Sequence, residues 1–131
     1  MNVAVGYEAG MNNKGHDNVF IGSSTGSGNI TGSGNVFLGP EVGSTGDHSD
    51  TLMIDNSATD TPLIYGEFNN DLVKVNGGLE VSTTTGALIV PRLDATTIAG
   101  LTAEDGMVVY NTTSNKFNFR IAATWKEMIG E

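Results

Sequence analysis

The chain has 131 residues, enough for one ordinary domain or two small ones, and a domain of this size buries only a modest share of its surface. Six basic against fifteen acidic side chains give a formal charge of −9, the wrong sign for binding nucleic acid or an anionic membrane. No apolar run approaches the length of a membrane span, and the absence of cysteine excludes disulfides. We therefore expect no nucleic-acid partner and no membrane insertion.

The first part of the chain repeats itself every sixteen or seventeen residues. Residues 2–6 (NVAVG), 18–22 (NVFIG) and 35–39 (NVFLG) align without gaps, and residues 51–55 are a degenerate fourth copy. Short β-favouring triplets between Gly, Ser and Asn turns do not have the spacing of a helix. The pattern predicts one short strand per coil of a β-solenoid, with glycine at corners that need positive φ and asparagine side chains stacked between coils.

Each predicted strand is apolar on both faces. Side chains alternate along a strand, so valine, isoleucine and leucine form one ladder and alanine, phenylalanine and methionine form the other. A thin coil buries only its inward face, so the other ladder must pack on other copies around an axis or, alternatively, on the C-terminal part of the same chain. We assign both ladders to the trimer interface or core: Val19, Phe20, Ile21, Val36, Phe37, Leu38, Leu52, Met53 and Ile54.

The second half has a different pattern of short strands and one short helix. Aspartate at the start of DATTIAGL (residues 94–101) can cap a helix, and TTSN separates two alternating segments of a hairpin. The predicted strands are residues 61–68, 71–76, 79–81, 87–90, 107–111, 116–120 and 124–129, with a polar link at 82–86. We divide the chain into a β-roll region (1–56), a β connector (57–86) and a C-terminal knob (87–131).

Two stretches resemble known families. The NVAVG and NVFxG units of residues 2–55 resemble the YadA-like β-roll heads of trimeric autotransporter adhesins and, more closely, the related repeats of phage-type tail fibres. This resemblance implies a parallel homotrimer whose strand ladder packs toward the three-fold axis. PRL, GMVVYNT and a final tryptophan, within residues 87–129, are similar to a small C-terminal module found in tail-fibre and surface proteins.

No residue pattern predicts catalysis, a cofactor or a metal. Nucleotide-loop motifs are absent, and Asp47, His48, Ser49 and Asp50 are adjacent on a loop, where their side chains do not converge as a catalytic set. A trimer could bring three copies of His16 or His48 together around a metal, and Asp47 and Asp50 could bind calcium, but solvated turn residues are the favoured interpretation. The exposed aromatics of a receptor contact would be Tyr110 and Trp125, against the alternative that the knob buries them.

The sequence thus predicts a non-enzymatic, all-β homotrimer: a β-roll or β-solenoid of about four coils, a β connector and a small β-rich knob with one short helix. The expected function is that of a structural or receptor-binding segment of an extracellular tail fibre, in a phage or a phage-like injection device. Its partners would be other copies, other fibre proteins and a host cell-surface glycan or protein. A bacterial cell-surface adhesin head and a hexapeptide-like solenoid acyltransferase are the alternatives. Because a repeat begins directly after Met1, we expect a fragment of a longer fibre.

Overall fold

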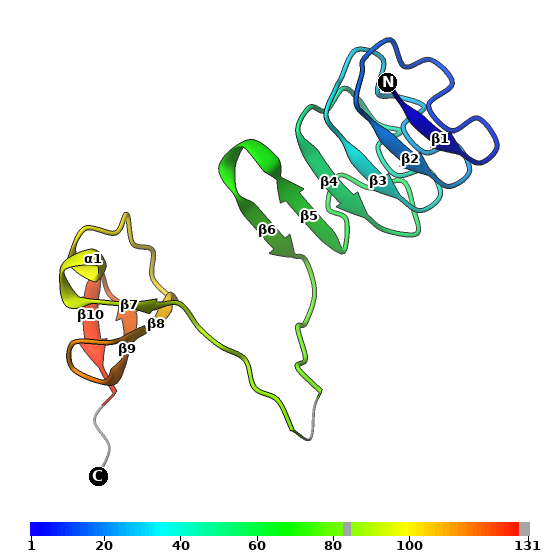
Figure 1. The fold of residues 1–131 in the computed structure, drawn as a ribbon. Helices are drawn as coiled ribbons and strands as arrows, with labels where there is room; N and C mark the ends of the chain where they lie inside the picture. The colour runs from blue at the N-terminus through cyan, green and yellow to red at the C-terminus, as the bar shows by residue number, and fades with distance from the viewer. Residues whose placement is uncertain (83–84, 129–131) are drawn as a thin grey trace. The chain divides into compact units, whose positions relative to one another are not determined.

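A computed structural model describes residues 1–82 and 85–128 of the chain. Two compact units make up the fold, Met1–Glu80 and Val81–Glu131 (Figure 1). Strands dominate both units, and the described residues contain only two short helical pieces, α1 and η1. The fold is therefore all-β, as the sequence predicts.

Four parallel strands of the first unit coincide with the four repeats (Figure 1). The strands β1 and β2 pair in register at Val3 and Val19, and β3 and β4 continue the same register at Val36 and Leu52. Backbone hydrogen bonds link the turns at the same offset, for example from Gly26 N to the carbonyl of Val42 at 2.7 Å. The predicted strand in each repeat is confirmed. The four strands are β1 (Val3–Val5), β2 (Val19–Ile21), β3 (Val36–Leu38) and β4 (Thr51–Ile54).

A hairpin extends this sheet beyond the repeats. Strands β5 (Ile64–Glu67) and β6 (Leu72–Val75) are antiparallel, are joined through the single turn η1 (Phe68–Asn70), and follow β4 in the sheet order. Leu52 of β4 pairs with Gly66 of β5, so the hairpin continues the sheet at the edge of the last repeat. The residues that we assigned to a connector therefore contribute, as far as Glu80, to the first unit.

The core of the first unit is a stack of side chains from successive repeats. Phe20 and Phe37 are almost fully buried with ring centroids 5.4 Å apart, and Val42 and Met53 complete the cluster. Gly26 has φ near +67°, and a Cβ there would lie 2.8 Å from the Phe20 ring. The glycine that follows each of the first three repeats, at Gly10, Gly26 and Gly43, is thus required both by its backbone conformation and by the adjacent aromatic ring.

A ladder of asparagine side chains runs beside this core. Asn18 N donates to Asn2 Oδ1 at 3.0 Å, Asn35 Nδ2 donates to Asn18 Oδ1 at 2.9 Å, and Thr51 N donates to Asn35 Oδ1 at 3.1 Å. Asn18 and Asn35 are both buried. Each amide therefore satisfies polar groups of the next coil, which confirms the predicted stacking of the asparagines.

The second unit is a four-stranded sheet in the order β10-β9-β8-β7, with one helix. Asp94 caps the helix by accepting a hydrogen bond from Thr97 N at 2.7 Å, as predicted. Ile98 and Val109 are its buried hydrophobic residues among those described. The elements are β7 (Arg92–Leu93), α1 (Ala95–Ala99), β8 (Val108–Asn111), β9 (Lys116–Ile121) and β10 (Thr124–Glu127).

Two of the predicted strands do not form. Residues 79–81 and 87–90 are not in strands; the pairing instead begins at β7, where Tyr110 N and Thr112 N donate to the carbonyls of Pro91 and Leu93. The proline carbonyl can accept a ladder hydrogen bond although its nitrogen cannot donate one. Residues 83–84 of the predicted link and residue 129 at the end of the predicted last strand lie outside the described residues.

Candidate functional site

The first unit has an apolar sheet face that the unit itself does not cover. Because side chains alternate along a strand, the residues flanking Phe20, Phe37 and Met53 point to the opposite side of the sheet. Val5 is 57% exposed and Val73 64%. We call this side the N-terminal open face; it consists of Val3, Val5, Val19, Ile21, Val36, Leu38, Leu52, Ile54, Ile64, Gly66, Val73 and Val75.

The fold separates the two predicted ladders. The aromatic ladder lies inside the single chain, where it forms the core together with Val42, a residue that the sequence analysis did not select. The aliphatic ladder lies on the N-terminal open face, and the hairpin β5–β6 adds Ile64, Val73 and Val75 to it. The alternation of Val73 and Val75 around Lys74 was the available sequence signal for the added positions.

The second unit also has one closed and one open side. Val109, Asn111 and Asn118 are buried on one side of the sheet. The neighbouring positions in the register point the other way, and Val108, Phe117 and Ile121 are each more than 40% exposed there. We call this side the C-terminal open face; it consists of Val108, Tyr110, Phe117, Phe119 and Ile121.

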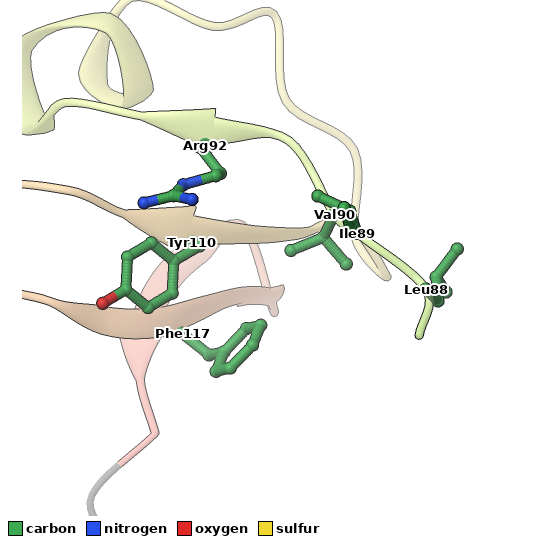
Figure 2. A pocket seen from close by; sticks show the side chains of 6 residues that line it. All are labelled: Leu88, Ile89, Val90, Arg92, Tyr110 and Phe117. Carbon is green, nitrogen blue, oxygen red and sulfur yellow. The ribbon is translucent and has the colours of Figure 1, made fainter. Parts of the chain in front are cut away.

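A hollow of about 340 Å³ adjoins this face (Figure 2). The rings of Tyr110 and Phe117 meet edge to face, with centroids 5.4 Å apart, and the guanidinium of Arg92 lies 5.5 Å from the Tyr110 ring centroid. Among the residues that the structure describes, Arg92 has no ion-pair partner. The hollow therefore presents two aromatic rings and one uncompensated cation. Its lining is completed by Leu88, Ile89 and Val90.

A second hollow, of about 380 Å³, is polar and belongs to the first unit. Its groups mainly contact one another: Lys74 Nζ lies 4.0 Å from the Glu67 carboxylate and 5.5 Å from the Tyr65 ring. A hydrogen bond from Asn70 lowers the pKa of Glu67, and desolvation raises the pKa of Tyr65. Lys74 and Glu67 are therefore paired with each other in this hollow. The hollow is lined by His48, Met53, Asp60, Thr61, Tyr65, Glu67, Lys74 and Asn76.

The histidines and aspartates that we considered for catalysis or metal binding lie in separate contacts. His16 Nδ1 is 2.9 Å from the Asp17 carboxylate, whereas the His48 ring packs edge-on against Phe37. The Asp47 carboxylate accepts hydrogen bonds from the backbone and hydroxyl of Thr31, both at 2.8 Å, which hold its pKa below the ordinary range. Among the described residues no three His, Asp or Glu side chains are grouped to hold a metal ion.

The two predicted receptor contacts lie on opposite sides of one sheet. Tyr110 is on the C-terminal open face beside the hollow. Trp125 pairs with Arg120, whose guanidinium is 5.9 Å from the indole ring, on the side of the buried Val109. A ligand bound to one side of the sheet would therefore contact only one of these two side chains. The receptor role of each remains a prediction.

An all-β chain that leaves an apolar sheet face open in both of its units has the surface of a self-associating protein. The chain belongs to the family described as the phage tail like trimerisation region, which matches residues 58–130, more than half of its length. This family supports a structural component of a phage tail or tail-like assembly that associates with itself as a trimer. No curated protein and no solved structure gives a significant match. Among the residues described, no helix is long and apolar enough to cross a membrane.

Proposed function

We propose that the chain is a non-enzymatic structural and receptor-binding segment of a tail fibre, in a phage or a phage-like injection device, and that it takes part in attachment to a host cell surface. In this proposal residues 1–56 form a β-roll, and three copies pack with their N-terminal open faces toward a common axis. The observation that carries the proposal is the continuity of that face. It runs from β1 through β6, and β5 and β6 lie inside the region that the trimerisation family matches.

The size of the face makes its exposure unfavourable. Five of its side chains are more than a third exposed in the single chain, namely Val3, Val5, Ile21, Val73 and Val75. Burying a valine, leucine or isoleucine fully is worth roughly 1.5–3 kcal/mol. Association costs freedom of motion, on the order of 4–15 kcal/mol for two chains, and burial of this apolar face would contribute against that cost.

The interior of the first unit suits a fibre that must hold its shape. The asparagine amides bond from coil to coil, and glycines at the corners let the backbone approach the Phe20 and Phe37 rings. Such a unit spaces its two ends rigidly without requiring a catalytic group. Attachment would use side chains outside the open faces, and a host cell-surface glycan or protein is the partner that we propose.

Light scattering of the purified chain tests the trimer. We expect the mass of three chains, and the mass of one chain would contradict the proposal. Val73→Asp places a charge on the N-terminal open face at a position that is exposed in the single chain, so it should dissociate the trimer without unfolding it. Lys74→Gln is the matched control, because Lys74 is the next residue of β6 and points to the other side of the sheet.

Attachment is tested on the intact particle. Antibodies against the purified chain should label the tail fibres in electron micrographs and should slow adsorption of the particle to its host cell. Labelled fibres with unchanged adsorption would limit the chain to a structural role. Absence of label from the tail would contradict its place in the fibre.

A further inference from the structure

Residues 87–90, which we call the arm, are apolar and largely exposed among the residues that the structure describes. Leu88 is 66% exposed and Ile89 is 81% exposed. The arm is not in a strand, and no described residue forms a hydrogen bond with the backbone of residues 88–90. Exposed apolar side chains and unpaired backbone groups in one segment are both features that a second chain can satisfy.

The arm borders a surface that also has exposed apolar side chains and polar groups without partners among the described residues. The hollow between the arm and β8–β9 is walled by the Tyr110 and Phe117 rings, and Phe117 is 42% exposed (Figure 2). Arg92 at its edge has donors but no acidic partner among the described residues. An occupant should therefore bring apolar side chains for the rings and oxygen acceptors for the guanidinium. An arm from another copy offers both, as apolar side chains and free backbone carbonyls.

We infer that, in the trimer, the arm and the C-terminal open face of each copy are covered by a neighbouring copy, and that the hollow is complete only in the assembly. This inference rests on the trimer of the proposed function. The occupant is a second copy because the arm, the hollow and the face all lie inside residues 58–130, the region that the trimerisation family matches. Heterologous contacts of this kind close after three copies related by a three-fold rotation.

The absence of cysteine allows a direct test of this contact. Ile89→Cys places a thiol on the arm, where the single chain gives no protection, and Thr96→Cys places one on the exposed surface of α1 in the same unit. Each purified variant is treated with a thiol-reactive dye at a concentration where its mass is that of three chains. We expect Ile89→Cys to react at least about tenfold more slowly than Thr96→Cys.

Three outcomes are distinguishable. Protection of Ile89→Cys at trimer mass that is lost when the same variant is diluted to one-chain mass supports the inference, because cover by a second copy depends on concentration and cover by the same chain does not. Equal labelling rates in a chain of trimer mass overturn the inference and leave the proposed trimer intact. A one-chain mass for both variants and for the unmodified chain overturns the inference together with the trimer.

A charge at the same position provides a second measurement. Ile89→Asp should lower the trimer fraction at micromolar concentration by at least tenfold, while the circular dichroism of the dissociated chain keeps its β signal. Thr96→Asp adds the same charge to the same unit and should leave the trimer fraction unchanged. An unchanged trimer fraction with Ile89→Asp would contradict burial of the arm.

Discussion

Each of the two units leaves one apolar sheet face open, but the units differ in the side chains that pack against the other face. The first unit stacks Phe20, Phe37, Val42 and Met53 and adds a ladder of buried amides, all from its own coils. In the second unit, only Ile98 and Val109 are buried hydrophobic residues among those described. A fold with so small a core is marginal by itself. We therefore expect the first unit to be the more stable by itself and the second to depend more strongly on association.

Removal of a buried aromatic ring from the first unit should have a stronger effect on stability than any other single change, and removal of an exposed ring from the second unit provides the contrast. Phe37→Ala removes a fully buried ring and should lower the free energy of unfolding of the first unit by about 3–5 kcal/mol. Phe117→Ala removes a ring that is 42% exposed and should mainly weaken association, so its effect should grow as the protein is diluted. Denaturant unfolding at several protein concentrations separates the two. Equal, concentration-independent losses would remove the distinction between the units.

Substitution in the ladder of asparagine side chains should cause the next largest loss of stability. Asn35→Ala removes the acceptor of the Thr51 N–H group and the donor to the His48 carbonyl, whereas Asn18 Oδ1 keeps its hydrogen bond from the backbone N–H of residue 35. Each group left unsatisfied in a buried place costs about 1–3 kcal/mol. Asn12→Ala is the control, because Asn12 is an exposed asparagine of the same unit and its loss should stay within about 0.5 kcal/mol. Thermal unfolding of both variants measures the difference. A comparable loss in the two would mean that the ladder contributes little.

Acid should weaken the first unit through its turn carboxylates. Hydrogen bonds from Thr31 lower the pKa of Asp47, and those from Leu63 and Ser57 lower the pKa of Asp55. Because the folded pKa lies below the unfolded value, this stability is present above about pH 4 and is lost as the pH falls through the lowered folded pKa. Asp47→Asn, which cannot ionise, should unfold with a shallower dependence on pH below 4. An unchanged slope would contradict the role of Asp47.

The smallest effect is expected at the helix cap of the second unit. Asp94→Ala removes the acceptor of the Thr97 N–H group and should lower the melting temperature of that unit slightly. Asp94→Asn keeps a capping oxygen and should restore most of the loss. A melting temperature of the Asp94→Asn variant as low as that of Asp94→Ala would point to the charge rather than the hydrogen bond as the stabilising feature.

The repeats, their register and the conformations at their corners follow from the amino-acid sequence, because these features depend on local chemistry. An apolar triplet between Asn and Gly predicts a short strand, Gly26 and Gly43 adopt positive φ, and identical side chains one coil apart stack. The Asp94 cap and the β8–β9 hairpin are local in the same way. These elements were predicted before any packing was known.

The choice of the ladder that lies inside the first unit depends on contacts between distant parts of the chain. Phe37 and its flanking residues Val36 and Leu38 are all apolar, so alternation defines two sides without choosing between them. Packing of the Phe37 ring with Phe20, Val42 and Met53 makes the choice. Packing also added β5 and β6 to the repeat sheet, left the arm without a strand partner, and placed Tyr110 and Trp125 on opposite sides. These outcomes depend on contacts between residues far apart in the chain, which the local preferences of the sequence do not contain.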